Sequence, residues 1–392
     1  MKKFLSVLLC ASLTLTCLVG CAGASTDAAS TESSSNGAAT FKIGGIGPIT
    51  GGAAVYGLAV MNAGQIAVDE INAAGGINGY QIEYNFQDDE LDNEKSVNAY
   101  NTLSDWGMQI LMGSVTSGCC VAVAAESSKA NMFQITPSGS AVDCIANDNV
   151  YQVCFTDPNQ GIAAADYISD NGVASKVAVI YDSSDVYSSG IYAKFAEEAA
   201  VKNLEIVSAE AFTADNKTDF SVQLQKAQDN GAELVFLPIY YTEASLILSQ
   251  ANKMGYAPKF FGCDGLDGIL GVENFDASLA EGVMLLTPFA ADAADDATKA
   301  FVAEYNKRFG ENPNQFAADA YDAIYIIKAA IEAKGLTPES SVSDICDACK
   351  DAMSTLKFDG LTGASMTWDA EGAVNKAPKA MEIVNGEYKL IQ

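Results

Sequence analysis

The feature that most constrains the fold is a regular alternation of short apolar runs with longer amphipathic segments, which begins at Phe41. Some of these runs, such as 177–180 and 234–237, are continuously apolar. A strand has this composition when both faces of its sheet are covered, as in the parallel sheets of α/β proteins. The alternation of such strands with helices therefore predicts doubly wound parallel sheets.

The predicted elements follow one another along the whole chain after residue 40. Strands are expected at 41–49, 81–87, 109–113, 132–136, 176–181, 205–212, 233–240, 259–263 and 282–287. Helices are expected at 57–74, 93–104, 116–129, 161–171, 188–202, 220–230, 243–254, 296–309 and 316–334. A β-hairpin at 380–391, which turns at Asn385-Gly386, ends the pattern.

The length of the chain favours two lobes over a single sheet. The chain has 392 residues, and a domain has roughly 150. Two corners read as crossovers between the lobes, one at Thr156-Asp157-Pro158 and one at Thr287-Pro288.

The first 40 residues read as an export signal followed by a tether. A basic start precedes an apolar run at 4–19, which is shorter than the roughly 20 residues of a membrane span but suits a signal peptide. The run ends at Cys21, and residues 18–21 resemble a bacterial lipobox. We expect a signal peptide at 1–20, lipidation of Cys21 and a flexible tether at 21–40. We expect no membrane span after residue 40.

Charge and composition exclude several classes of function. The chain carries 22 Lys and Arg against 50 Asp and Glu, a net charge of −28, so it should repel nucleic acids and anionic membranes. It has no histidine, which excludes Ser-His-Asp and Cys-His catalysis and His-ligated metals. The cysteines after Cys21 are odd in number and lack zinc-site spacing. We expect buried thiols and no metal or cofactor, and a Cys144–Cys154 bridge stays open.

One enzyme alternative comes from the glycines at the end of the first strand. Gly45 and Gly47 lie between a strand and a helix, and Asp69 follows about 20 residues later, as in dinucleotide-binding motifs. However, Thr50 stands at the third glycine position, and Pro48 lacks the N–H that a pyrophosphate would need. We keep a nucleotide-dependent enzyme as a distant alternative.

A series of short motifs carries a family resemblance by its order and spacing. The motifs lie at 43–44, 48–51, 69–79, 88–89, 113–114, 136–138, 155–157, 240–243 and 262–265. Together they resemble the type I periplasmic binding proteins, in particular the leucine/isoleucine/valine-binding group that serves ABC importers. The resemblance implies two doubly wound parallel-sheet lobes joined by three crossovers. The N-terminal lobe would comprise 41–157 and 288–366, and the C-terminal lobe 158–287 and 367–392.

The resemblance also implies where a ligand carboxylate would bind. It places the carboxylate at Ser117, in the loop that starts a helix, and at the loop that contains Ser138, Gly139 and Ser140. Backbone N–H groups at a helix start, reinforced by a hydroxyl, can hold a carboxylate without Arg or Lys. Local sequence alone would equally allow Ser117 to be an ordinary N-cap.

The remaining implied site residues come mainly from the second lobe. Asp264 would pair with an α-ammonium, although many relatives carry glutamate at this position and a turn aspartate is the local alternative. Tyr56, Tyr187 and Tyr240 would surround the side chain, although buried tyrosines also occur in ordinary cores. We expect Tyr241 to point away from the ligand if its strand continues.

The expected function is that of an extracytoplasmic solute-binding component of an ABC importer, not an enzyme. It would capture a neutral, branched-chain amino acid by hinge closure and deliver it to permease subunits. We expect a monomer, anchored through Cys21 to the outer face of the bacterial cytoplasmic membrane. The same scaffold could instead bind urea, a short amide or an aromatic acid. A sensory ectodomain would need a membrane span.

Overall fold

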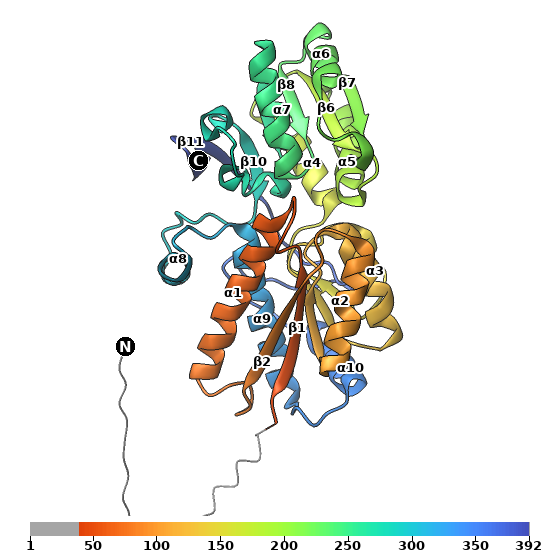
Figure 1. The fold of residues 1–392 in the computed structure, drawn as a ribbon, viewed down its shortest axis with the longest axis vertical. Coiled ribbons are helices and arrows are strands. Elements are labelled where there is room, and N and C mark those ends of the chain that lie inside the picture. The colour runs from red at the N-terminus through yellow and green to blue at the C-terminus, as the bar shows by residue number, and fades with distance from the viewer. Residues whose placement is uncertain (1–38, 392) are drawn as a thin grey trace, which may run out of the picture. The chain divides into compact units, whose positions relative to one another are not determined.

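The computed structural model describes residues 39–391. Residues 1–38 and 392 lie outside the described residues, and with them lie the expected signal peptide, Cys21 and nearly all of the expected tether. The described chain forms two sheets with helices on both faces (Figure 1). No helix in residues 39–391 is long and apolar enough to cross a membrane.

The first sheet has five strands, all paired in parallel, in the order β2-β1-β3-β4-β5. These strands are β1 (Phe41–Gly47), β2 (Ile82–Asp88), β3 (Ile110–Gly113), β4 (Gln134–Thr136) and β5 (Val150–Gln152). The helices of this lobe are α1 (Ala54–Ala73), α2 (Asn93–Trp106), α3 (Ser117–Lys129), α8 (Asp296–Phe309), α9 (Gln315–Lys334) and α10 (Val342–Met353). α1 packs with α9 on one face, and α2 packs with α3 on the other (Figure 1).

The second sheet has seven strands in the order β12-β11-β10-β9-β8-β6-β7. They are β6 (Lys176–Asp182), β7 (Glu205–Phe212), β8 (Leu234–Leu237), β9 (Lys259–Gly262), β10 (Met284–Thr287), β11 (Lys379–Val384) and β12 (Glu387–Leu390). Strands β6 to β10 pair in parallel, and β11 and β12 add an antiparallel hairpin at one edge. Its helices are α4 (Asp157–Asp170), α5 (Val186–Val201), α6 (Ser221–Asp229) and α7 (Tyr241–Met254). The predicted fold class is confirmed.

Local sequence signals account for most of the element ends. Every residue of β3, β8 and β10 is buried, as the continuous apolar runs predict. Asp92 caps α2 by accepting from the N–H of Lys95, and Asp185 caps α5 by accepting from the N–H of Ser188. The hairpin turns at Asn385 and Gly386, both with positive φ, as predicted.

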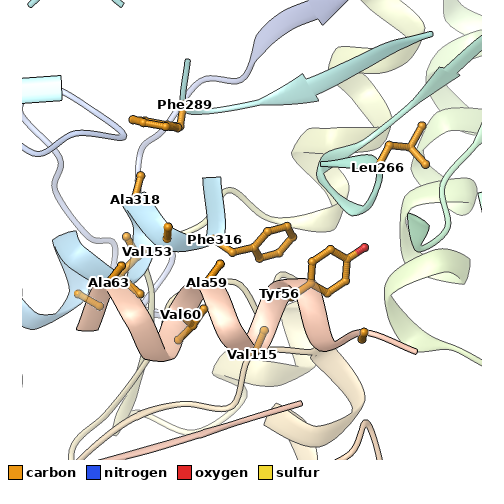
Figure 2. Packing of buried hydrophobic residues seen from close by; sticks show 14 of the residues in the cluster. Tyr56, Ala59, Val60, Ala63, Val115, Val153, Leu266, Phe289, Phe316 and Ala318 are labelled. Atoms are coloured by element: carbon orange, nitrogen blue, oxygen red, sulfur yellow. The ribbon is translucent and has the colours of Figure 1, made fainter. Parts of the chain in front are cut away.

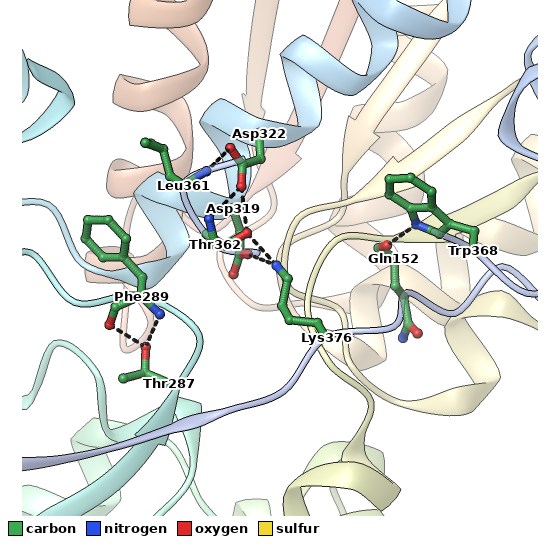
Figure 3. A network of polar contacts seen from close by, with 9 residues as sticks. All are labelled: Gln152, Thr287, Phe289, Asp319, Asp322, Leu361, Thr362, Trp368 and Lys376. Carbon is green, nitrogen blue, oxygen red and sulfur yellow. Dashed lines mark hydrogen bonds and ion pairs between the residues drawn. The ribbon is translucent and has the colours of Figure 1, made fainter. Parts of the chain in front are cut away.

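The third crossing from the first lobe to the second comes later in the chain than expected. Trp368 donates its indole N–H to the carbonyl of Gln152 at 2.8 Å. Lys376 donates its ammonium to Asp319 at 2.8 Å and to the hydroxyl of Thr362 (Figure 3). A buried indole N–H and a buried ammonium both require polar partners. Residues 367–376 therefore stay with the first sheet, and the chain crosses just before β11.

The cysteines of the described chain are buried free thiols, so the open Cys144–Cys154 bridge does not form. They are Cys119, Cys120, Cys144, Cys154, Cys263, Cys346 and Cys349. Burial raises the pKa of the Cys346 and Cys349 thiols to about 12. Thiols with such a pKa stay protonated and unreactive at neutral pH.

Candidate ligand-binding site

A small cavity lies where the two lobes meet, at the carboxyl ends of the parallel strands. Its free volume is about 10 Å³. The lining residues are Tyr56, Val115, Thr116, Ser117, Ser138, Tyr187, Tyr240, Asp264, Gly265 and Phe316. The loops after β3, β4, β8 and β9 supply most of them, which is where ligands bind in doubly wound α/β sheets. We call this the inner cavity.

The start of α3 forms one wall of the inner cavity. Thr116 is the N-cap, but its side chain makes no capping hydrogen bond, and Ser117 is the first residue of the helix. The hydroxyl of Ser117 accepts from the N–H groups of Ser140 and Ala141, both at 3.1 Å. Because both its lone pairs are engaged, its own proton remains to be donated. This wall therefore offers N–H and O–H donors to an anion.

The loop after β4 supports that wall from behind. Ser138 lines the cavity and donates its hydroxyl to the carbonyl of Val115 at 2.7 Å. Gly139 donates its N–H to Thr136 at 2.8 Å, and a Cβ at this glycine would lie 2.9 Å from the Cβ of Cys120. Gly139 and Ser140 do not line the cavity. The N–H of Ser140 holds the hydroxyl of Ser117, and a direct contact of Gly139 or Ser140 with a ligand stays a prediction.

Asp264 forms the opposite wall, directly after β9. Its side chain is buried and accepts from the hydroxyl of Tyr187 at 2.7 Å, while its backbone N–H donates to Gln160 at 3.2 Å. Burial raises the pKa of this carboxyl to about 6, against the opposing effect of the Tyr187 hydrogen bond. No lysine or arginine among residues 39–391 pairs with Asp264. A ligand cation would supply the missing positive charge.

Aromatic rings close the cavity between these two walls. Tyr187 stacks on Tyr240 with ring centroids 5.0 Å apart. Tyr56 lies edge-on to Tyr240 at 5.7 Å and tilted against Phe316 at 4.1 Å (Figure 2). Phe316, the second residue of α9, was not among the predicted site residues, because it lies far in sequence from the motifs that carry the family resemblance. Apolar ring faces of this kind suit an aliphatic ligand side chain.

Tyr241 lies outside the inner cavity, but for a different reason from the predicted one. The strand ends at Leu237, so Tyr240 is the N-cap of α7 and Tyr241 its first residue. Strand alternation therefore does not apply. The hydroxyl of Tyr241 instead accepts from the N–H of Val55 at 3.1 Å, which joins the second lobe to the start of α1.

Further hydrogen bonds join the lobes over the cavity. Tyr56 donates its hydroxyl to the carbonyl of Gly265 at 2.5 Å. Thr242 donates its hydroxyl to the carbonyl of Gly52 at 2.6 Å. The inner cavity, at about 10 Å³, is too small to hold an amino acid while these contacts are made, so binding there would require the lobes to separate.

The nucleotide alternative has no matching site in residues 39–391. A Cβ at Gly45 would lie 2.3 Å from the ring of Phe86, and one at Gly47 would lie 2.4 Å from Val115. These glycines make room for neighbouring side chains and not for a pyrophosphate. No group of three or more acidic, cysteine or histidine side chains in this range could hold a metal ion.

Known proteins with a similar chain share this two-lobed fold. A family model described as periplasmic binding protein matches residues 40–387. The Leu/Ile/Val-binding protein homolog 3 of Brucella melitensis is 31% identical over 309 residues, which cover 77% of this chain and 82% of that protein.

Two solved structures extend the comparison. The branched-chain amino acid transporter substrate-binding protein LivJ of Streptococcus pneumoniae, in complex with isoleucine, is 30% identical with a TM-score of 0.81, covering 90% of this chain and 99% of that one. A solute-binding protein of an ABC transporter from R. palustris, in complex with benzoate, is 18% identical with a TM-score of 0.78, covering 90% and 95%; it shows the fold alone. By its family match and its Brucella relative, the chain belongs to the periplasmic binding protein family.

Proposed function

We propose that the protein is the extracytoplasmic solute-binding component of an ABC importer and captures a neutral, branched-chain amino acid between its two lobes. The observation that carries the proposal is the composition of the inner cavity. Donors at the start of α3 face a carboxylate without a cation, Asp264, which comes from the other lobe. A zwitterionic amino acid would offer its carboxylate to the donors at the start of α3 and its ammonium to Asp264. The names of the Brucella and Streptococcus relatives support the same ligand class.

Capture would proceed in two steps. With the lobes apart, the ligand carboxylate binds to the donors of Ser117 and the first turn of α3. The second lobe then closes and brings Asp264 to the ammonium and the rings of Tyr187 and Tyr240 to the side chain. Closure removes water, which strengthens the charge-assisted hydrogen bond between ammonium and carboxylate. Permease subunits would recognise the closed form.

The proposal includes the membrane anchor expected from the sequence. Cys21 would carry the lipid, residues 21–40 would form the tether, and the protein would act as a monomer on the outer face of the membrane. Cys21→Ala should release the protein from washed membranes and abolish incorporation of a labelled fatty acid. Retention of both label and membrane association in this variant would contradict the lipid anchor.

A ligand screen tests the proposed function. The melting temperature of the protein is measured with each of the twenty amino acids and with urea, acetamide and benzoate. Leucine, isoleucine and valine should raise the melting temperature most, since a ligand at 100 times its Kd stabilises by about 2.7 kcal/mol. A response to benzoate, urea or acetamide with none to any amino acid would contradict the proposal.

A carboxylic acid without an amino group separates the amino-acid function from the aromatic-acid alternative. Benzoate and 4-methylpentanoate both lack the ammonium that Asp264 requires, and both would place a second negative charge opposite its carboxylate. We expect 4-methylpentanoate to bind at least 100-fold more weakly than leucine. Equal affinity for 4-methylpentanoate and leucine would favour an organic acid as the natural ligand.

A further inference from the structure

A second, larger cavity adjoins the inner cavity, and we call it the outer cavity. Its volume is about 470 Å³, within the usual size of small-molecule sites. Thr116 and Tyr240 line both cavities, so these two residues form the boundary between them. The start of α2 and the start of α3 line it from one lobe, and the loops after β6, β7 and β8 line it from the other.

The charges of the outer cavity are strongly unbalanced. Its acidic residues come from both lobes and are Asp92, Glu94, Asp182, Asp185 and Glu243. Lys217 is its only basic residue and pairs with Glu243 at 3.1 Å. The other four carboxylates have no cation within the cavity. Burial and the neighbouring Asp182 raise the pKa of Asp185 to about 6, as expected for a negative charge that lacks a partner.

A buried hydroxyl at the boundary also lacks a partner. Thr116 is 4% exposed, and its hydroxyl makes no hydrogen bond within residues 39–391. A buried polar group is normally hydrogen-bonded. Thr116 lines both cavities, so its side chain borders the passage from one into the other.

Two of the acidic side chains are held in place by hydrogen bonds from backbone N–H groups. Asp92 accepts from the N–H of Lys95 at 2.9 Å, and Asp182 accepts from the N–H of Ser184 at 2.8 Å. No group of three or more acidic, cysteine or histidine side chains in residues 39–391 is placed to hold a metal ion. An organic cation would supply the positive charge that the cavity lacks.

We propose that the binding site also accepts a basic amino acid, whose α-carboxylate and α-ammonium occupy the inner cavity and whose side-chain cation extends past Thr116 and Tyr240 into the outer cavity. The inference rests on the proposed function, because the inner cavity must first hold the amino-acid head group. Arginine is the basic side chain with the longest reach and with five N–H donors for the separated carboxylates. Citrulline has nearly the same shape without the charge and is the matched uncharged ligand.

Calorimetric titration of the wild type with leucine, arginine and citrulline tests this inference. Arginine should bind at least tenfold more tightly than citrulline. The affinity for arginine should fall with added salt while that for leucine should not, because the outer cavity is open to solvent.

The double variant Asp92→Asn/Asp182→Asn removes one charge from each lobe. Asparagine keeps the oxygen that accepts from the backbone N–H at both positions. The preference for arginine over citrulline should fall to less than threefold, while leucine affinity stays within twofold of the wild type. Asp295→Asn, at the N-cap of α8 outside the cavity, is the control and should change neither value.

The outcomes separate this inference from the proposed function. Binding of leucine without arginine, or an arginine preference that persists in the double variant, would overturn the inference and leave the function standing. If no amino acid binds at all, both fail. Arginine binding that depends on Asp92 and Asp182 supports both.

Discussion

At the scale of single residues, the proposed binding depends most on the ionisation state of Asp264. It is buried, its pKa is raised to about 6 by burial, and no described basic residue pairs with it. Removing one partner of a buried ion pair costs about 3–5 kcal/mol. In the proposed complex, the ligand ammonium would therefore supply the positive charge that the buried carboxylate of Asp264 lacks. The Tyr187 hydroxyl, which donates to Asp264 at 2.7 Å, fixes the orientation of that carboxylate.

Asp264→Asn should lower leucine affinity by about 100-fold or more without lowering the melting temperature of the unliganded protein. The first effect follows from the loss of the ammonium partner. The second follows from removal of a buried negative charge that no described lysine or arginine neutralises. Calorimetry and thermal unfolding measure the two quantities. Asp267→Asn is the matched control, because Asp267 is also buried but bonds the N–H of Gln315 and does not line the inner cavity. Binding by Asp264→Asn within threefold of the wild type would contradict the role given to Asp264.

The affinity for leucine should also depend on pH through Asp264. In the proposed complex the ligand would pair with the ionised carboxylate, whose pKa burial raises to about 6 in the protein without ligand. Below this pH the carboxyl must first lose its proton, so affinity should fall by up to tenfold per pH unit. Titrations at pH 7.5, 6 and 5 measure this slope. A flat profile in the wild type would mean that another group holds the ammonium.

At the scale of secondary-structure elements, close backbone approaches fix the cavity walls. α1 carries Tyr56 into the cavity, and its first turn lies directly on the loop after β1. A Cβ at Gly57 would lie 2.0 Å from the carbonyl oxygen of Pro48. By contrast, a Cβ at Gly190 in α5 would meet its nearest neighbour, an Asp157 oxygen, at 3.4 Å.

Gly57→Ala should therefore lower the free energy of unfolding by more than about 2 kcal/mol, since α1 must shift away from Pro48. Gly190→Ala should change it by less than about 1 kcal/mol and in the stabilising direction, because alanine favours a helix over glycine. Chemical denaturation measures both. Similar effects of the two substitutions would show that contact with Pro48 does not hold α1 in place.

Sequence patterns predict long elements well and short or tertiary features poorly. The apolar runs of β6 and β8 and the caps of α2 and α5 are local signals, so the fold could be predicted from them. β5, which has three residues, was not predicted. The early end of β8 at Leu237, which changes the setting of Tyr240, is decided by the start of α7.

In the candidate site too, the sequence identified individual residues but not the positions that depend on tertiary contacts. The resemblance identified Ser117 and Asp264, which the structure brings to opposite walls of one cavity. It could not show that Gly139 and Ser140 stand behind that wall, because their position depends on contacts with Thr136 and Ser117. Such contacts between distant segments leave no local pattern in the sequence.

At the scale of the whole molecule, buried carboxylates should govern the stability of the unliganded protein. Burial raises the pKa of several of them to about 6 or 7, namely Asp89, Asp185, Asp264, Asp267 and Asp319. A carboxyl with a raised pKa takes up a proton in the folded state before it does so in the unfolded chain. Its contribution to stability is complete below its unfolded pKa of about 4 and is lost as the pH rises through 6 to 7.

The melting temperature of the protein without ligand should therefore rise as the pH falls from 7.5 to 5. Protonation also lowers the self-repulsion of a chain with a net charge of −28. Scanning calorimetry across this range measures the effect. A melting temperature that falls steadily between pH 7.5 and 5 would contradict the raised pKa values.

In the proposed mechanism, the ligand is held between two lobes that must separate to admit it. Gly52 and Thr242 lie on opposite lobes, and a Cβ at Gly52 would be 4.0 Å from the hydroxyl oxygen of Thr242. The double variant Gly52→Cys/Thr242→Cys places two thiols where a disulfide could join the lobes. The native cysteines of the described chain are buried, which favours selective oxidation of this pair.

The most direct test is uptake of radiolabelled isoleucine by this double variant before and after reduction. The reduced protein should bind isoleucine as the wild type does. Protein oxidised without ligand should take up none, and protein oxidised with ligand should retain it until a reductant is added. Uptake and release of isoleucine by the oxidised protein at the rate of the reduced protein would contradict the account.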